Sequence, residues 1–212
     1  MAHYDLEEQE QLDTIKTWWK MYGNLVTTVI TALSLAVVAW QGWNWYQRNQ
    51  TAQASAIYSV LEQAVATKDA QKAKNAAGEL AEKFSGTPYA SLGALLAAKQ
   101  SFDSGDLKTA KSQLGWAASN GQDEIKDLAR LRLAAVLLDE KSYDEALKQL
   151  EGAHAGAFDA RFLELKGDVL AAQGKKTEAK AAYKAAQAKS TAKPGPGLEL
   201  LQQKLDSLGE AA

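Results

Sequence analysis

The spacing of charged and apolar residues divides this chain into a short polar start, one long apolar stretch and a long helical remainder. No charged residue occurs between Lys20 and Arg48. The interval is rich in Leu, Val and Ile. At about 1.5 Å per residue, a helix of this length crosses the roughly 30 Å of hydrocarbon in a bilayer. The pattern therefore predicts a transmembrane helix over residues 23–46.

Aromatic residues mark both ends of the predicted span. The set that we expect at the two membrane interfaces is Trp18, Trp19, Trp40, Trp43, Trp45 and Tyr46. Aromatic rings with one polar edge prefer the level of the lipid headgroups, which explains this placement. Inside the span, Thr27, Thr28, Thr31 and Ser34 are expected to return their hydroxyls to backbone carbonyls one turn earlier, so they weaken the prediction only slightly.

A buried helix of a soluble domain and a cleaved signal peptide are the two other interpretations of the apolar stretch. A buried helix of a soluble domain is usually shorter and carries a polar stripe. A cleaved signal peptide would explain the small residues Ala52 and Ala54, which imitate a cleavage site. However, a signal peptide begins with a short basic region, whereas the 22 residues before this span hold five acids against Lys16 and Lys20. We therefore expect an uncleaved anchor.

The residues before the span form an amphipathic pattern. Leu12, Ile15, Trp19 and Tyr22 recur at three- and four-residue intervals, which predicts a helix over residues 6–22 that runs into the membrane surface. The acids lie in its first turns, where they suit the helix dipole. Two interpretations of this segment remain open, a contact site and a solvated tether.

After Arg48 the composition favours helix throughout, because Ala, Gln, Lys, Glu and Leu dominate and no alternating β-branched run occurs. Turn-forming residues separate the expected helices at Ser85 to Pro88, Ser104 to Asp106, Asn120-Gly121, Gly152, Gly174 and Pro194 to Pro196. The predicted helices are 52–66, 70–84, 89–102, 107–118, 124–139, 143–151, 158–173, 176–189 and 197–208. The fold class is therefore all-α.

These helices repeat at a regular interval. Each of three units has a turn followed by an alanine, then by a large residue four positions later and an alanine seven positions later. The units are Ala110, Leu114 and Ala117; Ala146, Leu150 and Ala153; and Ala179, Tyr183 and Ala186. The first alanines are 36 and 33 residues apart, close to the period of about 34 of tetratricopeptide repeats. Small residues let paired helices approach, and the larger residue fills the gap. A weaker unit is possible over residues 57–88.

The last predicted helix has the character of a cap. Leu198, Leu201, Leu205 and Leu208 make one apolar stripe, and a stack of repeats needs a terminal helix to cover its exposed face. The sequence thus predicts a single N-terminal transmembrane helix followed by a tetratricopeptide-like α-solenoid with a C-terminal capping helix.

Neither the composition nor the motifs of the sequence indicate a catalytic or ligand-binding site. The formal net charge is −2, with −3 in the first 22 residues and +1 in the remainder, so no basic footprint for nucleic acid exists. There is no cysteine, so packing alone must stabilise the domain. His154 has no second His or Cys nearby and is expected to be a solvated loop residue. Gly174-Lys175-Lys176-Thr177 lacks the spacing of a phosphate loop. We expect no enzyme, no catalytic, cofactor or metal residues, and no small-molecule substrate.

Two stretches carry a resemblance to a known family. They are the segment from Glu8 to Trp19 with the adjoining span, and the segment from Tyr89 to Ala98 at the first clear repeat. With these stretches the whole chain resembles the YfgM family, the ancillary subunit of the bacterial Sec translocon. The resemblance implies an inner-membrane protein with its repeats in the periplasm, associated with the SecYEG translocon and with a PpiD-type periplasmic chaperone. Family members are also linked to envelope stress signalling.

The expected domain organisation and topology follow from these observations. We expect a cytoplasmic amphipathic segment at residues 1–22, the transmembrane helix at 23–46, a helical connector or degenerate first repeat at 47–88, repeats at 89–193 and the cap at 194–212. Lys16 and Lys20 precede the span and only Arg48 follows it closely, so the positive-inside rule weakly favours a cytoplasmic N-terminus. The resemblance supports the same orientation.

The sequence leaves two functions open. One is a membrane-anchored adaptor at the translocon, which binds a periplasmic chaperone and assists newly exported proteins. The other is a self-associating envelope scaffold or a stress-signalling regulator.

The first helix of each repeat pair should line a concave groove where a partner could bind. The candidate groove residues are Leu92, Leu95, Lys99, Phe102, Leu128, Leu131 and Leu138. Such an apolar lining favours a partner site. Filling from within, by residues 52–66 or 198–208, is the alternative.

Overall fold

The computed structural model describes residues 6–190 and 196–209, and these residues form helices and turns without a strand. The chain separates into two units, of which one ends at Gln50 and the other begins at Thr51. The first helix, α1 (Leu6–Ala66), contributes residues to both. The predicted all-α class is confirmed.

Helix α1 is continuous where the sequence suggested three separate helical segments. Its 61 residues include 47–51, between the predicted span and the predicted helix 52–66. These five residues contain neither Gly nor Pro, so nothing in the sequence ends the helix there. Among the described residues, α1 is the one helix that is long and apolar enough to cross a membrane. Its apolar side chains are exposed within the first unit; for example, Leu33 is 63% exposed.

The three threonines of the span bond to their own helix, as predicted, whereas the Ser34 hydroxyl makes no such bond in the described structure. The Thr28 hydroxyl donates to the carbonyl of Asn24 at 2.7 Å. Thr31 donates to the carbonyl of Thr27 at 2.8 Å. Thr27 lies between the carbonyls of Gly23 and Asn24, at 2.9 and 3.0 Å. These three hydroxyls therefore do not need water inside a bilayer.

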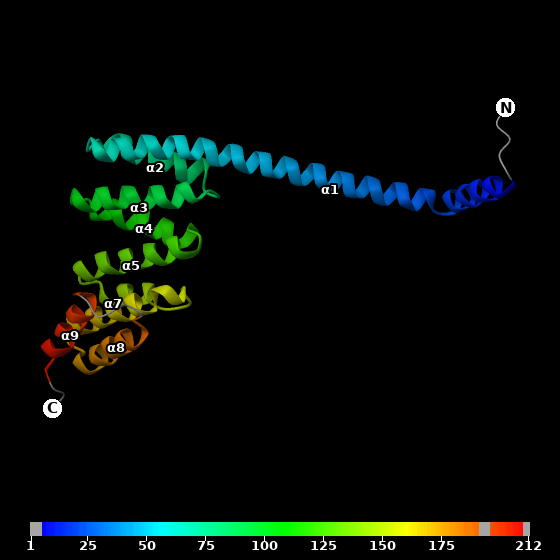
Figure 1. Cartoon of the computed structure of the whole chain (residues 1–212). Helices are drawn as coiled ribbons and strands as arrows, with labels where there is room; N and C mark the ends of the chain where they lie inside the picture. The colour runs from blue at the N-terminus through cyan, green and yellow to red at the C-terminus, as the bar shows by residue number, and fades with distance from the viewer. Residues whose placement is uncertain (1–5, 191–195, 210–212) are drawn as a thin grey trace. The chain divides into compact units, whose positions relative to one another are not determined.

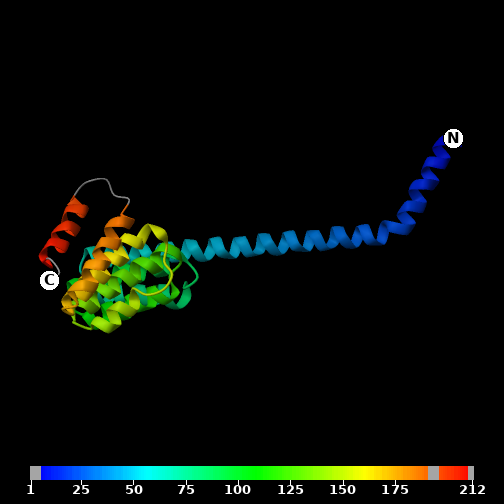
Figure 2. The same cartoon turned by 90° about the horizontal axis from the view of Figure 1, so that it is seen from below.

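The second unit is a stack of helix pairs (Figure 1). After the end of α1, its elements are α2 (Ala70–Lys83), α3 (Pro88–Asp103), α4 (Leu107–Asn120), α5 (Asp123–Asp139), α6 (Tyr143–Gln149), η1 (Gly156–Phe158), α7 (Asp159–Ala172), α8 (Lys176–Lys189) and α9 (Pro196–Ser207). From α2 to α9, each α-helix packs against the α-helix that follows it. Figure 2 shows the same stack from below. Apart from residues 52–66, which continue α1, the expected helices are present with ends that differ by a few residues.

Four turns of one geometry join the helices within each pair. At each turn one residue has positive φ: Lys68 at 56°, Gly105 at 82°, Lys141 at 62° and Gly174 at 78°. The N–H of the following residue donates to the carbonyl five positions back, at 2.8 to 2.9 Å. This is the Schellman ending of a helix. Lys68 has the same geometry as the other three, so the end of α1 is joined to α2 as the helices of the other pairs are joined. That residues 57–88 are a repeat stays a prediction.

The repeat positions lie in the core with one exception. Ala110, Ala146 and Ala179 are fully buried, and the large residues that follow them, Leu114, Leu150 and Tyr183, are buried too. Ala153 has the same position in its repeat as the buried Ala117 and Ala186, but it is exposed. Helix α6 ends at Gln149, so Ala153 lies in an exposed loop after Gly152, which has a φ of 89°.

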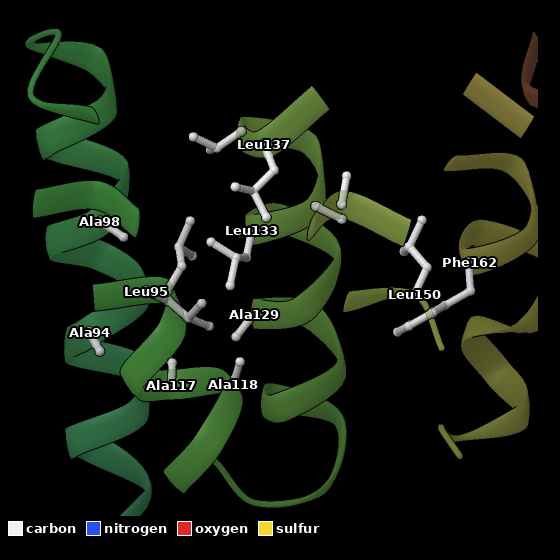
Figure 3. Close-up of a cluster of buried hydrophobic side chains, with 14 of the residues drawn as sticks. Ala94, Leu95, Ala98, Ala117, Ala118, Ala129, Leu133, Leu137, Leu150 and Phe162 are labelled. Atoms are coloured by element: carbon white, nitrogen blue, oxygen red, sulfur yellow. The ribbon is translucent and has the colours of Figure 1, made fainter. Parts of the chain in front are cut away.

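The largest core cluster joins α3, α4 and α5 and extends to α7. Figure 3 shows Leu95 of α3, Leu133 of α5 and Leu137 of α5 meeting across alanines of the neighbouring helices. A second cluster joins the end of α1 to α2 and α3 through Leu61 and Leu80. Alternating large side chains with alanines lets helices pack closely, which is the steric basis of the stack.

Helix α9 caps the stack, as predicted. Leu201 and Leu205 are buried against Leu170 of α7 and Tyr183 of α8. The ammonium group of Lys204 forms ion pairs with Glu164 at 2.9 Å and Asp168 at 2.8 Å, both on α7. Pro194 and Gly195, which belong to the predicted turn before the cap, lie outside the described residues.

Candidate functional site

A cleft between α3 and α5 lies within the second unit, the stack of helix pairs that begins at Thr51 and is called the repeat unit below. Its volume is about 330 Å³, within the range of small ligand or side-chain pockets. Nine residues from α3, α4 and α5 line it: Ala98, Lys99, Phe102, Asp103, Leu114, Arg132, Ala135, Val136 and Asp139. The cleft is therefore large enough for one or two apolar side chains of a partner.

The chemistry of the cleft is an apolar floor with a charged rim. Phe102 is 41% exposed although most apolar residues of the stack are buried. Lys99 forms an ion pair with Asp103 at 2.6 Å, and both side chains are more than half exposed. Arg132 and Asp139 are exposed on the opposite wall. An apolar segment with charges of both signs nearby would match this surface.

The structure divides the seven predicted groove residues into four groups, of which Leu95 alone forms the last. Lys99 and Phe102 line the cleft. Leu128, Leu131 and Leu138 are partly buried and pack against the largest core cluster. Leu92 is exposed on α3 but does not line the cleft.

The prediction that Leu95 would line a groove was wrong. Its side chain is 5% exposed, because it is enclosed between α4 and α5. Residues 52–66 and α9, which were the alternative fillers of the groove, contribute no residue to the lining of the cleft. The concave site is thus narrower than the sequence pattern suggested, and Lys99 and Phe102 are the two predicted residues that line it.

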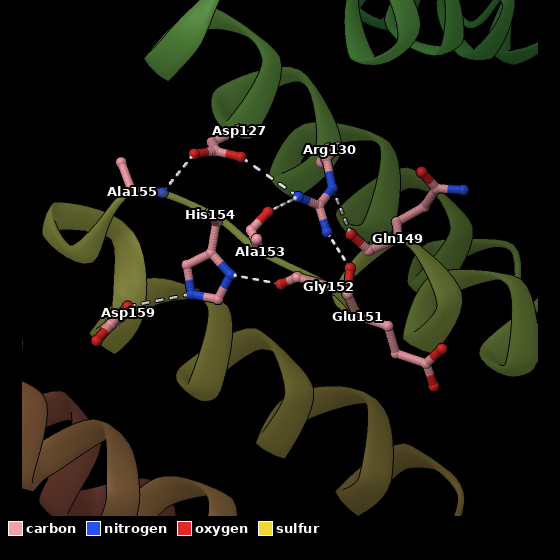
Figure 4. Close-up of polar contacts among 9 residues, drawn as sticks. All are labelled: Asp127, Arg130, Gln149, Glu151, Gly152, Ala153, His154, Ala155 and Asp159. Atoms are coloured by element: carbon pink, nitrogen blue, oxygen red, sulfur yellow. Dashed lines mark hydrogen bonds and ion pairs between the residues drawn. The ribbon is translucent and has the colours of Figure 1, made fainter.

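A buried polar cluster, which sequence reasoning missed, fixes the loop between α6 and α7 (Figure 4). The Arg130 guanidinium donates to the carbonyls of Gln149 and Ala153, each at 3.0 Å, and to that of Glu151. It also pairs with Asp127, at 3.3 Å, while the other carboxylate oxygen of Asp127 accepts from the N–H of Ala155 at 2.8 Å. The spacing of Asp127 and Arg130 by one helical turn was the only sequence feature that could have indicated it.

His154 belongs to the same loop and is packed rather than freely solvated, which corrects the prediction. Its ring stacks on Phe162 with 4.1 Å between centroids. Its Nε2 lies 3.2 Å from Asp159, which also pairs with Lys189 at 3.1 Å. Arg130 lies over the same Phe162 ring, 5.1 Å from its centroid. These contacts make the loop a structural clamp between α5 and α7. In the described part of the chain, no group of three or more His, Cys, Asp or Glu residues could hold a metal ion.

The aromatic residues predicted for the membrane interfaces lie on α1 and are exposed: Trp18, Trp19, Trp40, Trp43, Trp45 and Tyr46. Two ring contacts group them, Trp18 with Trp19 at 6.3 Å and Trp43 with Tyr46 at 6.2 Å between centroids. Their position in a membrane stays a prediction.

Comparison with known proteins identifies the family. The sequence model of the family described as "Tetratricopeptide repeat-like domain" matches residues 16–210. A protein of Neisseria gonorrhoeae named "Ancillary SecYEG translocon subunit" is 36% identical over 208 residues, which cover 96% of this chain and 98% of that protein. The chain belongs to the family of ancillary SecYEG translocon subunits.

Two further members of the ancillary translocon subunit family carry the same name. The Haemophilus influenzae protein is 34% identical, covering 87% of this chain and 90% of that protein. The Escherichia coli protein is 29% identical, covering 95% of this chain and 96% of that protein. The similarity therefore includes both the apolar part of α1 and the repeat unit, which together form the architecture of this family member.

Proposed function

We propose that this protein is a non-enzymatic adaptor of the bacterial inner membrane that associates with the SecYEG translocon. The observation that carries the proposal is the similarity, over nearly the whole chain, to proteins named as ancillary subunits of that translocon. The fold is consistent with this role, because stacked helical pairs provide extended surfaces for binding other proteins.

In the proposed topology α1 crosses the membrane once, with the N-terminus in the cytoplasm and the repeat unit in the periplasm. Two lysines, Lys16 and Lys20, precede the apolar stretch, and Arg48 follows it. Cytoplasmic flanks of a span carry an excess of Lys and Arg, which supports this orientation. Protease added to spheroplasts should then remove the repeat unit, and full protection behind an intact inner membrane would refute the orientation.

The repeat unit is proposed to bind a PpiD-type periplasmic chaperone through the cleft between α3 and α5, and so to assist newly exported proteins. Three features support this assignment. Phe102 offers exposed aromatic surface, Lys99 and Asp103 provide charges of both signs, and the volume of about 330 Å³ accepts an apolar side chain. Aromatic residues and Arg are the common centres of binding energy in protein interfaces.

Co-purification after mild detergent extraction tests the proposal. A tagged full-length chain should recover the subunits of the SecYEG channel together with a periplasmic chaperone. A matched chain in which Phe102 is replaced by Ala should still recover the channel but less chaperone. Recovery of the chain alone, or mainly of further copies of itself, would instead indicate a self-associating scaffold.

A further inference from the structure

One face of α1 before the span carries large side chains that no part of the described first unit covers. Five residues share this face at helical spacing: Leu12, Ile15, Trp18, Trp19 and Tyr22. Each is at least 42% exposed. The ring of Trp18 lies between its neighbours, 6.3 Å from Trp19 and 5.8 Å from Tyr22 between centroids. A continuous aromatic and aliphatic face of this kind usually marks a surface that contacts a protein or a membrane.

The opposite face of the same turns is polar and already satisfied. The hydroxyls of Thr14 and Thr17 donate to the carbonyls of Glu10 and Asp13 in their own helix, at 2.8 and 2.7 Å. Lys16 pairs with Asp13 at 3.2 Å. Between Gln11 and Tyr22, two lysines stand against the single carboxylate of Asp13. A helix with one aromatic face, one polar face and lysines is the composition of helices that lie in a membrane interface.

The junction with the span combines a covered glycine with a hydroxyl that bonds back to its own helix. The indole of Trp19 covers Gly23, with ring atoms 3.1 Å from the position of a Cβ there. Thr27 contacts the carbonyls of both Gly23 and Asn24, and such back-bonding by a hydroxyl often bends a helix. Both views draw the dark blue first turns of α1 at an angle to the blue turns that follow (Figures 1 and 2).

We propose that residues 11–22 lie along the lipid headgroup layer as an interfacial helix, with the face of Leu12, Ile15, Trp18, Trp19 and Tyr22 directed into the bilayer. The inference rests on the proposed membrane insertion of α1. Lipid is the occupant because the face continues directly into the span, so the helix that enters the bilayer carries it to the headgroups. Its aromatic rings and Lys16 and Lys20 match that layer, which is amphipathic and carries anionic lipids.

Single-cysteine spin labels test this orientation, since the natural chain contains no cysteine. The full-length protein is placed in vesicles of phosphatidylethanolamine and phosphatidylglycerol, and the depth of each label is measured by its accessibility to oxygen and to a water-soluble nickel complex. The matched pairs are Ile15→Cys with Thr17→Cys, and Leu12→Cys with Thr14→Cys. Members of a pair differ by only about 3 Å along the helix axis but point about 160° apart.

The two orientations reverse the order of depth within each pair. In an interfacial helix the labels at Ile15 and Leu12 are the deeper ones, with the apolar face buried by about 5–10 Å. In a helix that continues upright into water, Thr17 and Thr14 are the deeper members because they are nearer to the span. That reversed order would overturn the inference.

Two controls distinguish a wrong helix orientation from a failure of membrane insertion and from self-association of the chain. A label at Leu33 should lie near the bilayer centre, and a label there that is accessible to the nickel complex would remove the proposed insertion along with the inference. A label at Leu33 near the centre with the reversed order in the pairs would remove only the inference. Dipolar broadening at Ile15 that disappears when unlabelled chains are added in excess would assign the face to a second copy of the chain instead of lipid.

Discussion

The ring of Tyr183 occupies the space that a Cβ atom on Gly167 would need, with Cδ1 and Cε1 only 2.4 Å from that position. Gly167 lies on α7 and Tyr183 on α8, so the glycine lets the two helices of the last repeat approach each other. The Tyr183 hydroxyl then donates to Asp168 at 2.8 Å, which fixes the ring in place. The close approach of one helix pair is thus set by a single missing methyl group.

Replacement of Gly167 by Ala should destabilise the repeat unit by about 1–3 kcal/mol, because the added Cβ forces Tyr183 or the helices to move. Gly78 is the matched control. It also lies within a helix, and a Cβ there would meet nothing within 4 Å. Gly78→Ala should raise stability by about 0.5–1 kcal/mol, the usual gain in helix propensity. Thermal unfolding of the full-length protein in detergent measures both, and equal effects of the two substitutions would contradict the packing argument.

The four equivalent turns give a second prediction. Lys141 has a φ of 62°, in the left-handed region that costs a residue with a side chain roughly 1–2 kcal/mol. Lys141→Gly should therefore raise the free energy of unfolding by about 0.5–1 kcal/mol, after the extra flexibility of glycine in the unfolded chain is subtracted. In contrast, Lys184→Gly within α8 should lower it by about 1 kcal/mol. A loss of stability in both variants would show that the turn at Lys141 gains nothing from glycine.

These turns also show how much of the fold the sequence predicts. Gly105 and Gly174 mark helix ends through their own conformational freedom, and the helices around them were predicted within a few residues. Lys68 and Lys141 take the same conformation, yet a lysine in a sequence does not indicate positive φ. The continuity of α1 was missed because composition changes near Thr51 while the backbone has no reason to break there.

The candidate site was less predictable than the fold, because it depends on which side of each helix faces its neighbours. Helical spacing places Leu95 and Phe102 together on α3, and the structure buries the first and exposes the second. The difference arises from α5, which encloses Leu95 but leaves a cleft beside Phe102. Likewise, the clamp of Arg130 on the carbonyls of a loop some twenty residues later involves backbone atoms, which leave no pattern in the sequence.

The clamp at Arg130 should be among the most sensitive polar sites of the repeat unit. Arg130→Met removes the donors to three carbonyls and leaves the carboxylate of Asp127 buried at 6% exposure without its cation. Breaking a buried pair on one side costs about 3–5 kcal/mol. Urea unfolding should show this loss, whereas Arg161→Met should cost less than about 1 kcal/mol, because the Arg161 side chain is exposed and Glu164 keeps its pair with Lys204. Adding Asp127→Asn to Arg130→Met should restore part of the loss; no recovery would argue that the carboxylate is not the source of the cost.

Docking of the cap α9 should weaken in alkaline solution. Burial opposes the charged form of Lys204, but hydrogen bonds to Asp168 and Glu164 outweigh it and raise the pKa above its ordinary value of 10.5. Burial and the hydrogen bond to Asp168 also raise the pKa of Tyr183. A pKa that is raised in the folded state adds stability at low pH, and this contribution is lost as the pH rises above the unfolded value. The stability from both groups is therefore present below about pH 10 and declines above it.

The variant Lys204→Met isolates this effect. At about pH 8 it should be less stable than the natural chain by about 1–2 kcal/mol, and the difference should shrink by about pH 11.5, where the lysine loses its charge. Lys189→Met serves as the control, because Lys189 pairs with Asp159 at an exposed position and should contribute little at either pH. Urea unfolding at the two pH values measures the differences, and a constant difference for Lys204→Met would show that its charge does not hold the cap.

The last prediction separates the cleft from the core beside it. Leu131 is partly buried against the core cluster, whereas Phe102 is 41% exposed at the cleft. Leu131→Glu should therefore destabilise the repeat unit by about 2 kcal/mol or more, because it removes apolar burial and places a charge near the core. Phe102→Glu should change stability by less than about 1 kcal/mol, as substitutions at exposed positions usually do.

Binding should respond in the opposite way. If the cleft receives an apolar side chain of the chaperone, Phe102→Glu loses chaperone recovery in the co-purification while the unfolding midpoint stays within about 2 °C of the natural chain. Leu92→Glu is the matched control, since Leu92 is exposed on the same helix outside the cleft and its substitution should leave recovery unchanged. Full chaperone recovery with Phe102→Glu would place the partner surface elsewhere on the stack. Loss with both variants would extend it along α3 beyond the cleft.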